Sequence, residues 1–252
     1  MTSAELSELL RRAFRIYKKY FLKIILLSIL IYVPISVIQL MLPAVDMSGV
    51  TSENVSSYSG KLVTLLLSAV VLSLISGIFD LCMMYFTERD MIQQTVPLSE
   101  AFDFSLRCFP KYLATRILSY FLVFVLSMLC FIPGIIALFL FSLSPYIVVF
   151  RKSWGRKALR ESSVLVRRNA LAVILVIGLQ YFIAYAMSFA VNAAMVLLSD
   201  SGLPDLAQKG IWTAATVLLY ALISVLTVFM GLLVLKMIQN APELNKDPEP
   251  AP

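Results

Sequence analysis

Six long stretches of apolar residues, separated by shorter polar segments, dominate this chain. Each stretch reaches or approaches the roughly 20 apolar residues that an α-helix needs to cross a bilayer. The predicted fold class is therefore all-α, a polytopic membrane protein with a single six-helix domain over residues 1–240. A Pro- and charge-rich tail over residues 241–252 is expected to be disordered. The predicted crossings are about Ile24–Val45, Leu62–Phe86, Tyr112–Cys130, Pro133–Phe150, Asn169–Leu198 and Gly210–Leu235.

Prolines inside these stretches predict kinks and turns. Pro34 lies within the first stretch and is expected to kink that helix. No charge occurs from residue 117 to residue 150, which is too long for one crossing, so Pro133-Gly134 is expected to mark a tight turn between two helices. Pro145 has two interpretations: it opens a kink over a cavity, or it permits close helix packing, which is the commoner case.

The basic residues are distributed with a strong bias along the chain. Of the 21 Lys and Arg residues, all but Lys61 and Lys209 lie at the two ends or in every second connecting segment. Segments rich in Lys and Arg remain on the cytoplasmic side of a membrane. The bias therefore predicts that both termini are cytoplasmic.

Composition and charge narrow the function classes. Only 14% of the residues are charged and the mean hydropathy is +0.88, whereas a soluble domain carries about 25% charged residues. The net charge of +6 lies beside the apolar stretches, so it predicts contact with anionic lipid headgroups and not with nucleic acid. The chain has no histidine, and its three cysteines lack metal-ligand spacing. We therefore expect no catalytic residues, no metal site and no cofactor.

A repeated pattern occurs in the cytoplasmic segments. Residues 6–20, LSELLRRAFRIYKKY, align without a gap to residues 98–112, LSEAFDFSLRCFPKY, and residues 158–169 form a weaker third copy. Each copy predicts a short amphipathic helix leading into a membrane helix, so the domain would contain three units of about 1–90, 91–152 and 153–240. These helices either only orient the next crossing or recognise lipids specifically. The basic residues expected at headgroup height are Arg11, Arg15, Lys18, Lys19, Arg107, Lys111, Arg167 and Arg168.

Asp80 is the only acidic residue within a predicted membrane stretch. Lys23 on the first helix and Arg116 on the third are expected at similar depth. An ionised carboxylate in the membrane is costly, so we predict an intramembrane ion pair between Asp80 and one or both cations. The alternative is a proton or ion relay, which usually needs further titratable groups along a path.

Three stretches resemble a known bacterial family. PGIIALFLFSLSPYIVVF at 133–150, ALRESSVLVRRNALAVILVIG at 158–178 and FRIYKKYF at 14–21 are similar to the YciC-like family of uncharacterised inner-membrane proteins. They also resemble the membrane domain fused to some glycerophosphoryl diester phosphodiesterases. The resemblance implies six helices in a bacterial cytoplasmic membrane. It implies no catalysis, because the chemistry of the fused domain depends on histidines that this chain lacks.

The expected function is that of a non-enzymatic integral membrane protein, an envelope or lipid-associated scaffold. The alternative is a small transporter or lipid translocator. A continuous polar cavity that reaches the membrane midplane would favour transport, whereas a dry packed core would favour a scaffold. Membrane lipids are the expected partners, and no protein partner is indicated.

Overall fold

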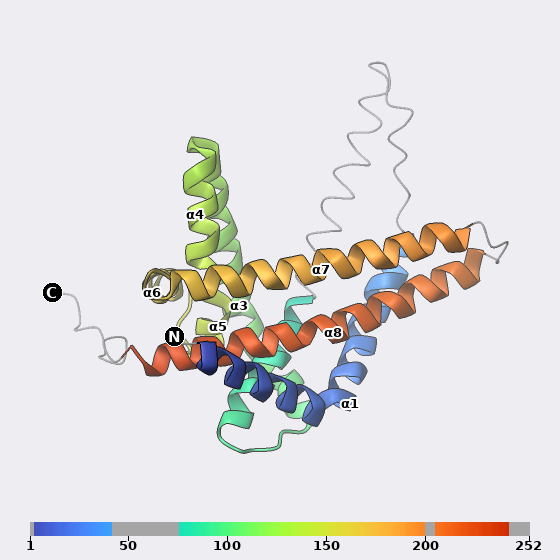
Figure 1. Ribbon diagram of the computed structural model, residues 1–252, viewed down its shortest axis with the longest axis horizontal. Coiled ribbons are helices and arrows are strands. Elements are labelled where there is room, and N and C mark those ends of the chain that lie inside the picture. Colours follow the sequence, from blue (N-terminus) through green and yellow to red (C-terminus); the bar gives the residue numbers. More distant parts are fainter. Residues whose placement is uncertain (1–2, 42–75, 200–204, 242–252) are drawn as a thin grey trace. The chain divides into compact units, whose positions relative to one another are not determined.

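The computed structural model describes residues 3–41, 76–199 and 205–241, which are helical with short connections and without strands (Figure 1). The all-α class is confirmed for these parts of the chain. Residues 76–91 form a helix, called helix 76–91 below. The other helices are α1 (Ser3–Met41), α3 (Leu98–Leu129), α4 (Phe131–Phe141), α5 (Ser144–Phe150), α6 (Arg156–Arg168), α7 (Ala170–Ser199) and α8 (Asp205–Gln239).

The chain divides into two compact units. The first, called the main unit below, combines Met1–Phe21, Asp80–Ala186 and Ile223–Pro252, and the second combines Leu22–Phe79 and Met187–Leu222. Within the main unit α8 is deeply buried, because Val228, Leu232 and Leu233 are at most 1% exposed. Both candidate sites described below lie entirely within the main unit.

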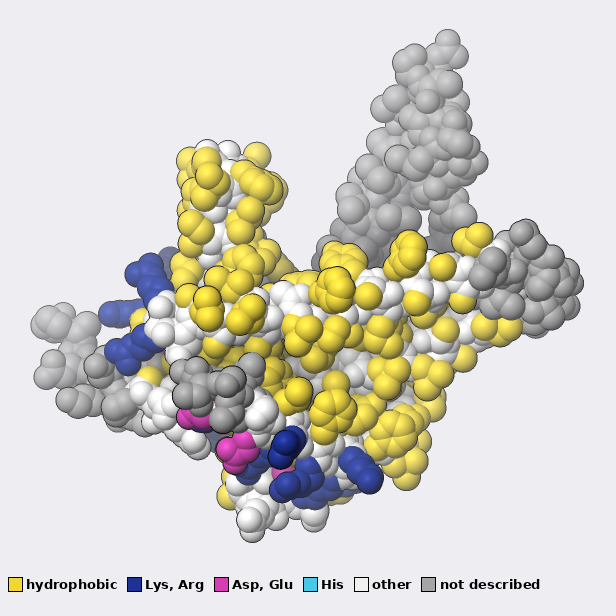
Figure 2. All heavy atoms as spheres, viewed as in Figure 1, with side chains coloured by type: hydrophobic (Ala, Val, Ile, Leu, Met, Phe, Trp, Pro, Cys, Tyr) yellow, Lys and Arg dark blue, Asp and Glu magenta, His cyan; other side chains and the backbone are white. Residues whose placement is uncertain are grey.

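Four helical segments are long and apolar enough to cross a membrane. They are Leu98–Leu129, Phe131–Phe150, Ala170–Ala194 and Gly210–Gln239, and they correspond to the third to sixth predicted crossings. Apolar side chains cover the visible faces of α4 and α7 (Figure 2). The first two predicted crossings extend beyond the described residues, so six crossings and a threefold repeat remain predictions.

The turn between the third and fourth crossings lies at Cys130, ahead of Pro133-Gly134. Cys130 is the single residue between α3 and α4, with an extended backbone of φ −165° and ψ 142°. Pro133 instead falls in the first turn of α4, where its missing N–H removes no helical hydrogen bond. Gly134 has a packing role, because a Cβ there would lie 2.8 Å from the Cα of Ser127. Glycine therefore lets α3 and α4 approach closely.

The three amphipathic segments differ in their boundaries. The first two were expected as short separate helices, but they continue without a break into the long helices α1 and α3. The third forms the separate helix α6, which buries Leu159, Leu165 and Val166. Asn169 ends α6, since its backbone N–H donates to the carbonyls of Leu165 and Val166. Only the third copy is therefore a helix that ends before the following apolar helix begins.

The two remaining prolines occupy different helical positions. Pro34 lies inside α1, which is helical on both sides of it. Pro145 lies in the first turn of α5, and Ser142-Leu143 separates α4 from α5. The hydroxyls of Ser142 and Ser144 donate to carbonyls three residues earlier, both at 2.7 Å. These serine hydroxyls therefore supply donors to the backbone where the fourth crossing is interrupted.

Candidate functional site

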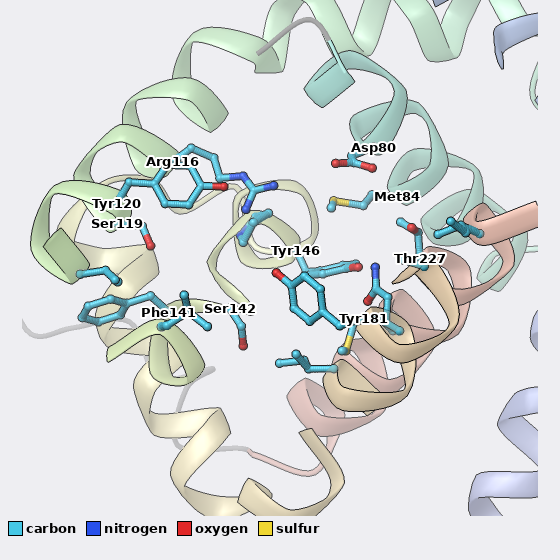
Figure 3. Close-up of a pocket in the computed structure, with 18 residues that line it drawn as sticks. Asp80, Met84, Arg116, Ser119, Tyr120, Phe141, Ser142, Tyr146, Tyr181 and Thr227 are labelled. Atoms are coloured by element: carbon cyan, nitrogen blue, oxygen red, sulfur yellow. The ribbon is translucent and has the colours of Figure 1, made fainter. Parts of the chain in front are cut away.

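A cavity of about 240 Å³ lies among α3, α4, α5, α7, α8 and helix 76–91 (Figure 3). Much of its wall is apolar, including Met84, Leu138 and Met230. Polar side chains also line the cavity, although the helices around it are mostly apolar. These polar residues are Asp80, Arg116, Ser119, Tyr120, Ser142, Tyr146, Gln180, Tyr181 and Thr227.

Arg116 is held by aromatic residues one helical turn away on either side. Its Nε donates to the Tyr112 hydroxyl at 3.2 Å. Its guanidinium carbon lies 5.6 Å from the ring centroid of Tyr112 and 5.5 Å from that of Tyr120. A guanidinium is attracted to the face of an aromatic ring. Residues four apart share one face of a helix, so α3 itself positions this cation.

Asp80 faces the same cavity from helix 76–91. Figure 3 shows its carboxylate and the guanidinium of Arg116 on different walls of the cavity. The two groups interact electrostatically, but within the described residues they form no direct ion pair. Lys23, the other predicted partner, belongs to the second unit, so its pairing with Asp80 remains a prediction.

The cavity opens onto an apolar flank of the main unit. Tyr120, Leu138 and Tyr181 line it, yet they are 53%, 43% and 55% exposed. Their neighbours Phe121 and Phe182 are exposed as well. A membrane-spanning orientation of α3 and α7 would place such an opening against lipid.

A second, larger hollow lies at the N-terminal half of α1 and is called the basic pocket below. It measures about 460 Å³ and is mostly cationic in character. Lysine and arginine side chains gather over this part of the molecule (Figure 2). The residues that line it are Glu8, Arg11, Arg12, Arg15, Lys19, Asp90 and Gln93.

Contacts with helix 76–91 and the turn after it hold the basic pocket in shape. Lys19 forms a salt bridge with Asp90, in which its ammonium donates a hydrogen bond to the carboxylate. This hydrogen bond raises the pKa of the Lys19 ammonium above its ordinary value. Tyr20 is stacked on Phe86 with ring centroids 4.8 Å apart. The Tyr20 hydroxyl also donates to the Gln94 carbonyl at 3.2 Å. The basic pocket is therefore a built surface and not a freely moving helix end.

All the residues predicted at headgroup height have exposed side chains, but only Arg11, Arg15 and Lys19 meet in the basic pocket. Lys18 is exposed elsewhere on α1. The others lie on α3 and α6: they are Arg107, Lys111, Arg167 and Arg168. Arg12, which lies within the first repeated segment, also lines the basic pocket, whereas Asp90 was missed.

The basic connecting segment contains a buried ion pair that the sequence did not indicate. Nε of Arg151 lies 2.8 Å from the Glu161 carboxylate, and the two side chains are 16% and 8% exposed. The Ser153 hydroxyl also donates to Glu161, at 3.2 Å. Nearby, the N–H of Gly155 donates to the Thr115 hydroxyl at 2.9 Å. The contacts of Glu161 hold the connecting segment against α6, and the Gly155 hydrogen bond joins the start of α6 to α3.

The two sites present charged, hydroxyl and aromatic side chains. Within the described ranges no three Cys, Asp or Glu residues converge to hold a metal ion. No family model, curated protein or solved structure matches the chain, so the resemblance to the YciC-like family remains a prediction. The observed class is an all-helical protein with four segments able to cross a membrane.

Proposed function

We propose that this chain is a non-enzymatic integral membrane protein of the bacterial cytoplasmic membrane, where it acts as a lipid-associated scaffold of the envelope. The apolar segments of α3, α4–α5, α7 and α8 support the membrane location. The bias of Lys and Arg supports cytoplasmic termini. The basic pocket supports the association with lipid.

The observation that carries this proposal is the amphipathic character of α1 around the basic pocket. Four cations line the pocket, and Leu10, Phe14 and Phe21 on the same helix are 40%, 55% and 44% exposed. A helix at a membrane interface places such apolar side chains among acyl chains and its cations near phosphates. Each cation near an anionic surface contributes about 1 kcal/mol.

Native mass spectrometry of the purified full chain with mixed lipids tests this proposal. The double substitution Arg11→Gln and Arg15→Gln should reduce retained phosphatidylglycerol and cardiolipin about thirtyfold relative to zwitterionic lipid, because two cations leave the basic pocket. The control is Arg156→Gln with Arg160→Gln, which removes the same charge outside that pocket. Equal lipid selectivity in the wild type and the α1 variant would contradict the lipid-associated role.

The cavity supports a second candidate function, a small transporter or lipid translocator. Opposite charges on separate helices and an opening on the apolar flank are suited to a passing polar group. Reconstitution into vesicles with a fluorescent lipid separates the two candidates. Translocation faster than in protein-free vesicles, and slowed by Ala184→Phe at the cavity wall, would favour a translocator. A rate equal to that of protein-free vesicles would favour a scaffold.

A further inference from the structure

We infer that the cavity between α3 and α7 is a binding site for a zwitterionic head group in which a phosphate and an ammonium ion are joined by a short linker. Phosphoethanolamine has this chemistry. The site depends on the proposed membrane location of the helices but not on the scaffold role or on the basic pocket.

The two charges of the cavity call for a ligand that carries both signs. Asp80 and Arg116 face one space from different helices, without a direct ion pair in the described chain. Charges away from water are stable only when they are paired and hydrogen-bonded. A simple anion would leave Asp80 uncompensated, and a simple cation would leave Arg116 uncompensated. A compact zwitterion satisfies both.

Arg116 is suited to the phosphate. A guanidinium is planar and binds phosphate oxygens through two parallel N–H donors. The hydrogen bond to Tyr112 uses Nε, and Figure 3 shows the terminal nitrogens of Arg116 directed into the cavity. Ser119 and Tyr120, on the next turn of α3, place hydroxyls on the same wall. The α3 wall thus provides several donors for one anionic group.

Asp80 is suited to the ammonium ion. Its carboxylate accepts hydrogen bonds, and an ammonium ion offers several donors of opposite charge. The rings of Tyr146 and Tyr181 stand in the same cavity (Figure 3). Aromatic faces attract ammonium ions, most strongly when these are removed from water. The wall opposite α3 therefore has the character expected of a cation subsite.

The size and opening of the cavity favour a lipid as the source of the head group. A volume of about 240 Å³ lies below the roughly 300–1,000 Å³ of pockets that enclose drug-sized ligands, so acyl chains would remain outside. The opening lies at Tyr120 and Tyr181, next to the exposed apolar side chains of Phe121 and Phe182. Arg116 follows Lys111 by about 7 Å of helix rise, a depth just inside the cytoplasmic interface. A free zwitterion from water is the other possible source.

Lipid retention by the full chain in nanodiscs, measured by native mass spectrometry, tests the site. The Arg11→Gln and Arg15→Gln background lacks the anionic retention of the basic pocket, and in it we expect phosphatidylethanolamine to be retained over phosphatidylglycerol under conditions that remove bulk lipid. Arg116→Gln should lower retention of both lipids roughly tenfold or more, since the phosphate partner is lost. Asp80→Asn should lower phosphatidylethanolamine by a similar factor and leave phosphatidylglycerol unchanged, since only the ammonium partner is lost. That split distinguishes a zwitterion site from a general anion site.

A steric variant with a matched control separates loss of binding from loss of folding. Ala184→Phe narrows the cavity without touching a charge, whereas Ala186→Phe places the same ring at an exposed position on α7. We expect the first to reduce phosphatidylethanolamine retention and the second to leave it unchanged. Asp103→Asn is an exposed charge control on α3 and should also leave it unchanged. Equal retention in the Ala184 and Ala186 variants would overturn the proposal.

Competition by soluble O-phosphoethanolamine separates the two sources. If it leaves the bound lipid in place, the site takes a lipid head group. If it displaces the lipid at millimolar concentration, the same chemistry is recognised as a free zwitterion. Retention that does not differ between phosphatidylethanolamine and phosphatidylglycerol in the Arg11→Gln and Arg15→Gln background contradicts a zwitterion site. The α1 double variant tests the scaffold separately, because it should change anionic lipid and not phosphatidylethanolamine.

Discussion

Removing one partner of the Arg151–Glu161 pair should strongly destabilise the protein. Glu161→Ala removes the carboxylate that lies 2.8 Å from Nε of Arg151, a side chain that is only 16% exposed. Truncating one partner of a buried ion pair costs about 3–5 kcal/mol. Because Arg151 keeps some access to solvent, we expect about 2–4 kcal/mol here. The Ser153 hydroxyl also loses its acceptor, which adds to the cost.

Thermal unfolding of the full chain in detergent measures this loss. For a chain of this size, about 1 kcal/mol corresponds to a shift of roughly 2–4 °C in the midpoint. Glu161→Ala should therefore lower the midpoint by about 4–16 °C. The matched control is Asp103→Ala, whose pair with Arg107 spans 4.0 Å with side chains 85% and 72% exposed. An exposed pair contributes about 1 kcal/mol at most. Equal shifts in the two variants would refute the reasoning from burial.

The other predictions concern topology, helix packing and pH. A single cysteine in place of Pro204 should react with a membrane-impermeant thiol reagent in intact cells, and one in place of Lys157 should not. Labelling at position 157 would reverse the predicted topology. Gly134→Ala should cost about 1–3 kcal/mol of unfolding free energy, because its Cβ would press on Ser127, and an unchanged midpoint would contradict the close helix approach. Burial raises the pKa of Glu88, so its stabilising contribution should be complete below pH 4.5 and fall as the pH rises through the raised value. Glu88→Gln should remove that fall, and identical pH profiles of the midpoint would contradict it.

Length and apolar composition were sufficient to predict the later long apolar helices. The predicted helix Asn169–Leu198 matches α7, which spans Ala170–Ser199. The turn near residue 130 was misplaced because proline is a strong breaker inside a helix but is tolerated in a first turn. The break before Pro145 illustrates the same tolerance, with Pro145 again in the first turn. Local sequence thus predicts that a helix is interrupted more reliably than it predicts the residue at which the interruption lies.

The candidate site was only partly visible in the sequence. Asp80 and Arg116 stand out because ionisable groups are rare in apolar stretches. Tyr146 and Tyr181 do not stand out, since tyrosine is common in such stretches and nothing local brings the two together. Their meeting depends on how α5 and α7 pack. The cavity is therefore a property of tertiary structure that composition and spacing do not record.

The position of the apex of the α3–α4 hairpin would depend on the thickness of the bilayer. The apex carries the apolar side chains of Leu129, Phe131 and Ile132, which are 76%, 74% and 66% exposed. From Lys111 to Cys130 the helix rises about 28 Å, close to the roughly 30 Å of a typical hydrocarbon core. The hairpin would thus end at the far interface without a polar loop to anchor it. In a thicker bilayer the apex would be submerged, whereas in a thinner one α3 would tilt. Hydrophobic mismatch would then set which membranes accommodate this hairpin at least cost.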